Sequence, residues 1–502
     1  MFWKKLTKGL KFPLFLYLLP LFFVFHGFVE YFFLVPVLPA LLLFAKYFCA
    51  TLVLHGIFYC IFKNNNKAAL FVFLLFSTYY FFGIFHDLLK KTFPGTYITK
   101  YSFILPFLLL LVVFSFINIK RKSFPGKLII YLNSLFLIFL IIDIFSLQQK
   151  ISSYDRQRET NNINKKFSVC DTCSKPDIYL IITDEYAGKK TLADIYQNDN
   201  SSFYSELRKR KFQISENSFS NYNITQASIA SILNLDYLNL DKQNLSNTPM
   251  KAFFNAIDTN ILVPFLSFHG YQFINNSVFQ VSGQPPLAIT PFVPVNTRII
   301  EYQTLSSRLM KDLGHLLIQW GLRGDLNGDN EYTVKNNNEK IIANLKKKVI
   351  KKSAAPKFVY SHLMMPHFPY YFDSLGNASP TSLIIYNEEN IHLDKMYVSY
   401  LKYTNGVLLN IVDYILQHSE KPPVIMILSD HGFRLYANKI SRHYQFINLN
   451  ATYFPKEYTI DLPDSLSNIS YMRAVLNILF HQNLPINKQD TFFIPRVKRD
   501  SQ

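Results

Sequence analysis

The sequence predicts an α-helical membrane domain followed by an α/β domain with a mainly parallel β-sheet. Two features of the chain indicate this fold class. The first 147 residues contain about five apolar segments, each close to the roughly 20 residues that a helix needs to cross a bilayer. After residue 176, short apolar runs of strand length alternate with helical stretches, as expected for a parallel sheet covered by helices on both sides.

The apolar segments account for much of the high aromatic content, which is 16% of the chain. The first segment is too long for the core of a signal peptide and has no clear cleavage site, so we expect it to be retained. The approximate boundaries of the five segments are 13–36, 37–62, 68–88, 103–119 and 128–147.

Basic residues beside these segments predict how the chain crosses the membrane. The lysines within residues 1–12, Lys63, Lys67 and the basic cluster 120–127 would all face the cytoplasm under the positive-inside rule. The loop 87–100 does not fit this rule, because it also contains lysines. With five crossings and a cytoplasmic N-terminus, everything after the fifth segment lies on the extracytoplasmic side.

The composition argues against a nucleic-acid partner. The net charge of +18 comes from basic residues that flank apolar segments or lie in polar loops, and no zinc-finger spacing or RNA-binding aromatic motif accompanies it. We therefore expect no nucleic-acid partner.

The sequence predicts four parts along the chain. These are a transmembrane domain over 1–147, a polar linker over 148–175, an extracytoplasmic α/β domain over 176–490 and a C-terminal tail over 491–502.

A Cys-x-x-Cys pair, Cys170 and Cys173, precedes the first predicted strand of the α/β domain. A redox motif of this kind normally follows a strand and opens a helix. A small disulfide loop and two idle thiols are therefore the two alternatives that the sequence leaves open.

The α/β domain begins with an apolar run, 178–182, that suits a strand buried on both faces of a sheet. Two carboxylates, Asp184 and Glu185, follow it directly. Open α/β sheets bind ligands at the carboxyl ends of their strands, so these two side chains are candidate metal ligands. The alternative is that Asp184 only caps the helix that follows.

Two later strands end in similar chemistry. The predicted strand 357–363 leads into His367, which lies between two prolines, and the predicted strand 424–428 leads into Asp430 and His431. Asp beside His at a strand end, with a glycine after them to permit a sharp turn, is typical of a metal site. For His367 alone, an exposed loop histidine is the alternative.

Thr225 opens a predicted helix whose first turns, residues 225–231, are rich in Ala and Ser. A threonine in this place is most often an N-cap. The same position also offers backbone N–H groups to a phosphate and a hydroxyl that a metal can activate as a nucleophile. His443 is a further candidate, and carboxylate, imidazole and hydroxyl groups together suit zinc or manganese.

The order of these motifs resembles the alkaline phosphatase superfamily. In particular the sequence looks like its sulfatase-like membrane transferases, namely lipoteichoic acid synthase and the lipid A phosphoethanolamine transferases. Those proteins also have about five N-terminal crossings before an extracytoplasmic catalytic domain. The resemblance covers the whole chain in architecture and roughly residues 176–480 in motifs, of which Ser-Asp-His-Gly at 429–432 is the most specific.

The resemblance implies a role for each candidate residue. Thr225 would be the nucleophile, which becomes covalently phosphorylated, and Glu185 is a further candidate for the metal site. His367 and His443 would bind the substrate phosphate or assist the leaving group. The residues that would bind a divalent metal, zinc or manganese, are Asp184, Thr225, Asp430 and His431.

One departure from the family pattern separates two reactions. True sulfatases need a Cys or Ser in the motif C/S-x-P-x-R, whereas Thr225 is followed by Gln-Ala-Ser, without Pro or Arg. Phosphoryl chemistry is therefore favoured over the hydrolysis of sulfate esters.

The leading hypothesis is a metal-dependent membrane-bound transferase. It would move a phospho-alcohol head group, of the phosphoethanolamine or phosphoglycerol type, from a membrane lipid donor through a covalent Thr intermediate to an envelope glycan, lipid or polymer. The first alternative is a sulfatase-like hydrolase of the same fold, a phosphodiesterase or sulfuric ester hydrolase. The second is a membrane sensor or assembly protein with an inactive domain. The expected location is the bacterial inner (cell) membrane, with several crossings and the catalytic domain outside.

Overall fold

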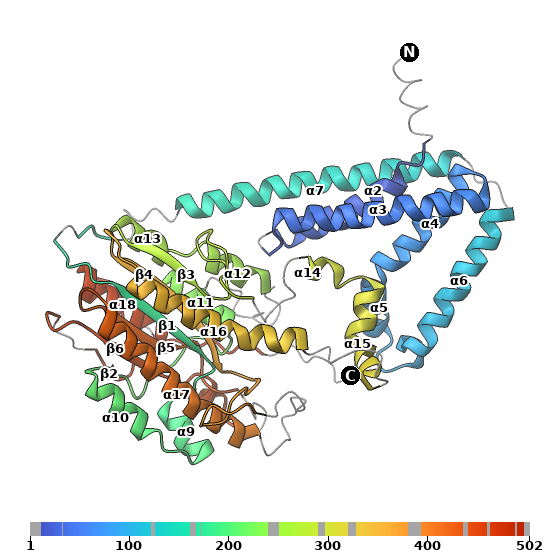
Figure 1. Cartoon of the computed structure of the whole chain (residues 1–502). Coiled ribbons are helices and arrows are strands. Elements are labelled where there is room, and N and C mark those ends of the chain that lie inside the picture. Colours follow the sequence, from blue (N-terminus) through green and yellow to red (C-terminus); the bar gives the residue numbers. More distant parts are fainter. Residues whose placement is uncertain are drawn as a thin grey trace. The chain divides into compact units, whose positions relative to one another are not determined.

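The computed structural model describes most of the chain (Figure 1). The N-terminal lysines, Lys122 and the end of the predicted tail lie outside the described residues, so their expected positions stay predictions. By internal contacts the chain forms two compact units, Met1–Arg156 with Phe292–Leu326 and Gln157–Pro291 with Asn327–Gln502. The described residues are 12–32, 34–121, 126–160, 167–170, 172–238, 250–289, 297–319, 328–379, 393–434, 440–458, 462–486 and 489–495.

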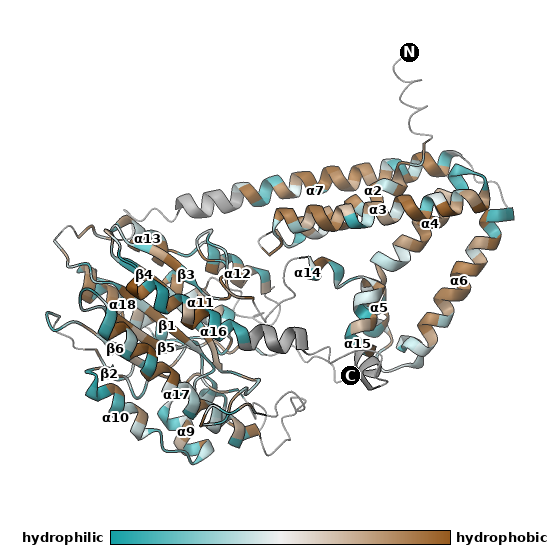
Figure 2. Ribbon diagram, viewed as in Figure 1, coloured by the Kyte–Doolittle hydropathy of each residue, from teal (hydrophilic) through white to brown (hydrophobic). Residues whose placement is uncertain are grey.

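The first unit is helical and contains the apolar segments predicted from the sequence. By length and composition α3, α6 and residues Gly126–Ser152 of α7 can each cross a membrane, and the pair α4–α5, bent by 56°, adds a fourth span if counted as one. The apolar helix α2 is shorter, with 16 residues. The expected helical membrane region is therefore confirmed, with three to four spans in place of about five, and Figure 2 shows α3 and α6 as largely hydrophobic. The bounds are α2 (Phe15–Glu30), α3 (Val37–Phe62), α4 (Asn65–Tyr80), α5 (Phe82–Thr92), α6 (Tyr101–Arg121) and α7 (Gly126–Thr160).

Aromatic side chains pack the interior of this helical unit. Phe23 of α2 stacks on Tyr80 of α4 with ring centroids 4.5 Å apart, and Tyr47 of α3 meets Tyr80 edge-on at 4.9 Å. All three side chains are buried. Aromatic pairs of this kind contribute about 0.5–1.5 kcal/mol each beyond the area they bury, so they hold the first three helices together.

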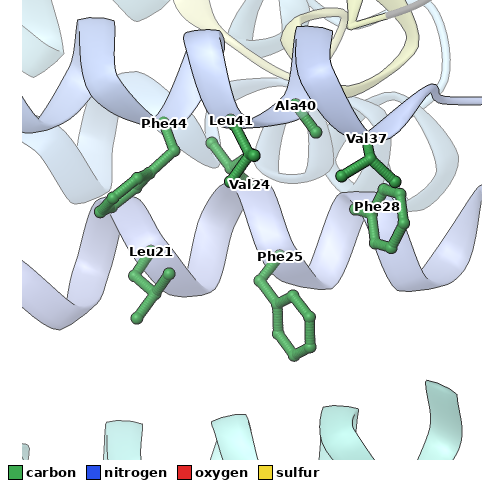
Figure 3. Close-up of a pocket in the computed structure, with 8 residues that line it drawn as sticks. All are labelled: Leu21, Val24, Phe25, Phe28, Val37, Ala40, Leu41 and Phe44. Atoms are coloured by element: carbon green, nitrogen blue, oxygen red, sulfur yellow. The ribbon is translucent and has the colours of Figure 1, made fainter. Parts of the chain in front are cut away.

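Between α2 and α3 the helical unit has an apolar groove of about 180 Å³ (Figure 3). Figure 3 shows that its side chains come from both helices. Lipid chains are as apolar as these side chains, so such a surface suits a membrane environment. The residues that line the groove are all hydrocarbon in character: Leu21, Val24, Phe25, Phe28, Val37, Ala40, Leu41 and Phe44.

A short segment from a later part of the chain also belongs to the first unit. The helices α14 (Arg298–Glu301) and α15 (Leu305–Gln319) lie within the residues that the sequence assigns to the α/β domain, yet they pack against α2, α4 and α5. Ile300 is only 2% exposed. A Cβ on Gly27 of α2 would lie 2.8 Å from the Ile300 side chain, so the close approach favours glycine there.

Polar contacts fix the same segment to the helical unit. Arg308 donates to both carboxylate oxygens of Asp87 in α5, at 2.9 and 2.6 Å. Tyr101 of α6 donates to Asp312 at 2.6 Å. The Arg308 side chain is 5% exposed and the Asp87 side chain 53%, so only the guanidinium is shielded from water, and the two-pronged geometry is what favours this pair over an ordinary surface ion pair.

The second unit is built on a six-stranded sheet in the order β2–β6–β5–β1–β4–β3. The strands β3, β4, β1 and β5 run parallel, whereas β6 is antiparallel to both β5 and β2. The predicted, mainly parallel sheet is confirmed, with β1 inside it. The bounds are β1 (Ile178–Asp184), β2 (Gln213–Ile214), β3 (Gln272–Asn276), β4 (Lys357–Pro366), β5 (Val424–Ser429) and β6 (Asn450–Tyr453).

Helices surround this sheet (Figure 1). α16 and α17 pack against β4 and against each other, and α11 packs against α12, α13 and α18. Every residue of β1 is buried, and each fully buried Ile or Leu stabilises the fold by about 1.5–3 kcal/mol. The bounds are α9 (Lys189–Tyr196), α10 (Ser201–Lys209), α11 (Thr225–Asn234), α12 (Met250–Asp258), α13 (Leu262–Phe268), α16 (Gly328–Ile350), α17 (Leu393–His418) and α18 (Asn468–Phe480).

The segment before β1 contains a disulfide between Cys170 and Cys173. Of the two alternatives left by the sequence, the structure therefore has the small disulfide loop.

The register of the sheet brings several strand ends to one edge. Thr183 of β1 is paired with Leu363 of β4 on one side and with Ser429 of β5 on the other. The residues that follow Thr183 and Ser429, which are Asp184 and Asp430, are therefore neighbours at the carboxyl edge of the sheet. Ligands of open parallel sheets bind at this edge.

Candidate active site

Three residues of the metal-ligand type meet at the carboxyl edge of the sheet. The ligand atoms of Asp184, Asp430 and His431 lie within 4.8 Å of one another, and all three side chains are completely buried. His431 Nε2 is 3.8 Å from Asp184 Oδ1 and 3.3 Å from Asp430 Oδ2. Because the three residues end two paired strands, the sheet itself sets their spacing.

Thr225 contributes its hydroxyl to the same cluster. Its Oγ1 is 3.2 Å from His431 Nε2 and 3.5 Å from Asp184 Oδ1. Ile224 occupies the N-cap position and Thr225 is the first residue of α11, so the interpretation of Thr225 as an N-cap is wrong. The structure thus brings together the four residues that the sequence named for a metal site.

His431 is held as a neutral imidazole with one nitrogen facing the cluster. Its Nδ1 donates to the Gly432 carbonyl oxygen at 2.7 Å, which leaves Nε2 as an acceptor. Burial, together with the charge of Arg434, lowers the pKa of His431 to about 3. A neutral ring with an available nitrogen lone pair is the form that binds a metal ion.

The two carboxylates have pKa values that shift in opposite directions. Burial alone would raise the pKa of Asp184, but His367, His362 and His431 outweigh burial and bring that pKa below its ordinary value. Burial and the charge of Asp184 raise the pKa of Asp430 well above its ordinary value. Without a cation, the negative charge of the pair is therefore favoured on Asp184 and disfavoured on Asp430.

This arrangement fits a divalent metal ion. Asp184 Oδ2 and Asp430 Oδ2 are buried, and no donor among the described residues reaches either oxygen in hydrogen-bond geometry. Buried carboxylate oxygens without partners are costly, and a cation bound between them would remove that cost. The two carboxylates, His431 and the Thr225 hydroxyl would hold the ion, and oxygen and imidazole ligands suit zinc or manganese.

Metal binding at this cluster is expected to release a proton. Burial and the charge of Asp184 raise the pKa of Asp430 in the metal-free protein, and the cation needs the carboxylate form. Protons therefore compete with the metal for Asp430, and the metal affinity should fall as the pH is lowered. Calorimetric titration with zinc in two buffers of different ionisation enthalpy measures the release. We expect the heats to differ between the two buffers; equal heats would contradict this.

Glu185 directs its carboxylate away from the other ligands. Its Oε1 accepts from the Arg434 backbone N–H at 3.0 Å, and its Oε2 is 3.4 Å from His367 Nε2. The backbone N–H of Glu185 donates to Asp430 Oδ1 at 3.0 Å. The structure therefore brings His367 close to the cluster through Glu185. A role for Glu185 as a further metal ligand stays a prediction, which this geometry does not favour.

His443 is the one sequence candidate that the structure does not bring into contact with the clustered residues. It lies in the 3-10 helix η4 (Arg442–Gln445), and its Nδ1 is 2.9 Å from Ser441 Oγ. It lines a separate cavity of about 390 Å³, and its role with substrate stays a prediction. The other residues that line this cavity are Lys190, Glu216, Asn217, Phe219, Arg442, Phe446, Ile447 and Thr491.

Two residues beside the cluster were not predicted from the sequence. His362 lies inside β4, completely buried, with its Nε2 3.8 Å from Asp184 Oδ2. Arg434 follows His431 by three residues, and its side chain is 11% exposed. The available signal for His362 was a single histidine in an otherwise mostly apolar strand, and for Arg434 it was a cation just after an Asp-His-Gly motif.

The C-terminal end of the described chain holds the residues that lead into Thr225. The Asn223 side chain, 1% exposed, accepts from the Ile494 N–H at 2.8 Å and donates to the Ile494 carbonyl at 3.1 Å. Phe492 N–H donates to the Asn221 carbonyl at 2.8 Å. Part of the predicted tail therefore helps to position the hydroxyl at the start of α11.

The fold and the family comparison together place this chain in a class of enzymes with a sulfatase-type domain. The Sulfatase family model matches residues 176–466, which is more than half of the chain, and the chain belongs to the sulfatase family. The match covers all four clustered residues, His367 and His443. A search among curated proteins finds no match.

The chain is also similar to several solved structures. The C-terminal periplasmic domain of EcEptC from Escherichia coli, in complex with Zn, is 12% identical, with 66% of this chain and 90% of that one covered and a TM-score of 0.39. The soluble domain of lipooligosaccharide phosphoethanolamine transferase A from Neisseria meningitidis is 12% identical, with coverage of 62% and 90% and a TM-score of 0.38. A phosphonate monoester hydrolase from Silicibacter pomeroyi is 13% identical, with coverage of 65% and 78% and a TM-score of 0.39.

Proposed function

We propose that this enzyme is a metal-dependent, membrane-bound transferase. It moves a phospho-alcohol head group, of the phosphoethanolamine or phosphoglycerol type, from a lipid donor to a hydroxyl of an envelope glycan, lipid or polymer. The observation that carries the proposal is the Thr225 hydroxyl, buried 3.2 Å from His431 Nε2 beside two carboxylates. The apolar helices of the first unit support a lipid donor and a multi-pass protein of the bacterial inner membrane.

In the first step, Thr225 Oγ1 attacks the phosphorus of the donor and releases its proton to solvent, while the bond from phosphorus to the lipid alcohol oxygen breaks. Asp184, Asp430 and His431 would hold a divalent metal ion, which would lower the pKa of the hydroxyl and stabilise negative charge on the phosphoryl oxygens. We assign the protonation of the leaving oxygen to His367, whose side chain is 27% exposed and whose Nε2 is 3.4 Å from Glu185 Oε2.

In the second step, a hydroxyl of the acceptor attacks the same phosphorus, and the bond from phosphorus to Thr225 Oγ1 breaks. His367, which has given up its proton in the first step, takes the proton of the attacking hydroxyl, and Thr225 takes up a proton from solvent. Each residue therefore returns to its starting state after one transfer.

A hydrolase of the same fold is the second candidate, supported by the match to the Sulfatase family model. In that case water replaces the acceptor hydroxyl in the second step, and a phosphodiesterase or a sulfuric ester hydrolase results. Incubation with a lipid labelled in its head group separates the two. Label in an acceptor supports transfer, whereas free head group alone supports hydrolysis.

Mass spectrometry of the Thr225 peptide tests the covalent step. The full-length protein is incubated with zinc or manganese and with bacterial membrane lipids, then stopped in acid and digested. We expect an added mass on Thr225 equal to the phospho-alcohol group, which also identifies that group. An unmodified peptide in a preparation that turns over the lipid would contradict the proposed intermediate.

A further inference from the structure

We infer that Arg434 binds a non-bridging oxygen of the transferred phosphoryl group, together with His367, and that Glu185 is a positioning residue for Arg434. The inference rests on the proposed function, because it takes a phosphoryl group as the substrate. It assigns Arg434 a role in binding, and it assigns Glu185 a role other than metal ligation.

The contacts of Glu185 carry the first part of the argument. Its Oε1 accepts from the backbone N–H of Arg434 at 3.0 Å and lies 3.3 Å from Arg434 Nε, while its Oε2 is 3.4 Å from His367 Nε2. The carboxylate is 8% exposed. Its two oxygens thus face Arg434 and His367, and the ligand group of Asp184, Asp430 and His431 does not include it.

The geometry of Arg434 carries the second part. Glu185 contacts the Nε end of the guanidinium, and one terminal nitrogen, Nη2, is 3.4 Å from His367 Nε2. A guanidinium has five N–H donors in a planar fork that matches the oxygens of a phosphate. Contact at the Nε edge fixes the plane of the fork and directs the terminal nitrogens past Glu185, toward the side where His367 lies.

The positive charge of Arg434 lies beside the cluster at which a negatively charged phosphoryl group would bind. This positive charge acts on the cluster, where it helps to lower the pKa of His431. A phosphoryl group bound between Thr225 and His367 would meet the same positive field. Arginine–phosphate contacts are among the strong hydrogen bonds of proteins, and a buried guanidinium already held by a carboxylate loses little freedom when it forms them.

Phosphate binding tests the role of Arg434 without turnover. The probe is inorganic phosphate, titrated by calorimetry into the full-length, zinc-loaded protein in detergent. In Arg434→Ala the dissociation constant should rise at least about tenfold, the loss typical of one charge-assisted hydrogen bond. Arg434→Lys, which keeps the charge but not the fork, should recover part of the affinity, and millimolar guanidinium should recover part of it in Arg434→Ala.

Arg210→Ala is the matched control. Arg210 also pairs with a carboxylate, Asp413, in the same unit, through contacts of 2.6 and 2.9 Å, and both side chains are half-buried. This variant should leave phosphate affinity unchanged. Equal phosphate affinity in Arg434→Ala and the unchanged protein would overturn the inference.

Metal content tests the role of Glu185. Glu185→Gln should keep the full metal content of the protein while it weakens phosphate binding, whereas Asp184→Asn should lose the metal. Loss of metal in Glu185→Gln would show a ligand and overturn its assignment as a positioning residue. If Arg434→Ala does not fold, Arg434→Lys and Glu185→Gln still decide the question.

The inference and the proposed function fail in different ways. Phosphate binding that depends on Arg434, in a protein whose Thr225 never becomes modified by lipid, would refute the transferase and leave the anion site in place. A lipid-derived adduct on Thr225, in a protein whose phosphate affinity is unchanged by Arg434→Ala, would refute the anion site alone.

Discussion

Replacing Thr225 by alanine is expected to lower turnover at least about 1,000-fold, because the variant lacks the oxygen that attacks phosphorus. The metal content should stay close to that of the unchanged protein, since Asp184, Asp430 and His431 remain in place. Turnover is measured with a head-group-labelled lipid, and metal content by elemental analysis of the purified protein.

Ser228→Ala is the control for this result. Ser228 lies one turn further along α11, equally buried, and its hydroxyl donates to the Tyr222 carbonyl at 2.8 Å instead of facing the cluster. Its loss should change stability more than turnover. Substantial turnover in Thr225→Ala, above about one-tenth of the original rate, would exclude the covalent mechanism.

Replacing Asp430 by asparagine should remove both the metal and the activity. Asn has nearly the same shape, but its neutral amide oxygen cannot balance the charge of the cation, and Asp430 is one of only two carboxylates in the ligand group among the described residues. We expect the metal bound per chain to fall from about one to near zero after dialysis, with activity at background.

Asp413→Asn is the matched control, because Asp413 is a half-buried carboxylate that pairs with Arg210 and is not part of the ligand group. It should keep the metal and the activity. Full metal content in Asp430→Asn would show that the ion binds elsewhere in the protein. The assigned cluster would then be wrong.

The sequence was a good guide to site residues that directly follow a strongly apolar strand. The runs that became β1, β4 and β5 are rich in buried apolar residues, and parallel strands bring their ends to one edge, so Asp184 and Asp430 were placed together without a structure. Thr225 was harder, because a threonine that opens a helix has an ordinary explanation as a cap. Only the structure, in which Ile224 is the N-cap and Thr225 contacts His431, decides between the two.

The parts that escaped prediction lack a local signal. β2 has two residues and β6 has four, so neither is long enough to show a strand period, and β6 contains Asn450 and Thr452. His362 looked like an ordinary strand residue. The partners of Arg434 and of Arg308 lie 249 and 221 residues away, and no pattern along the chain links residues over such distances.

The segment 297–313 makes the solubility of a truncated enzyme depend on the helical unit. Its residues fall within the span matched by the Sulfatase family model, yet Ile299, Ile300 and Arg308 find their burial and their carboxylate partner in the helical unit. A secreted version of the enzyme that begins after the linker would expose these side chains to water. Such a version should aggregate or need detergent, and trimming this segment should restore its solubility without touching the catalytic residues.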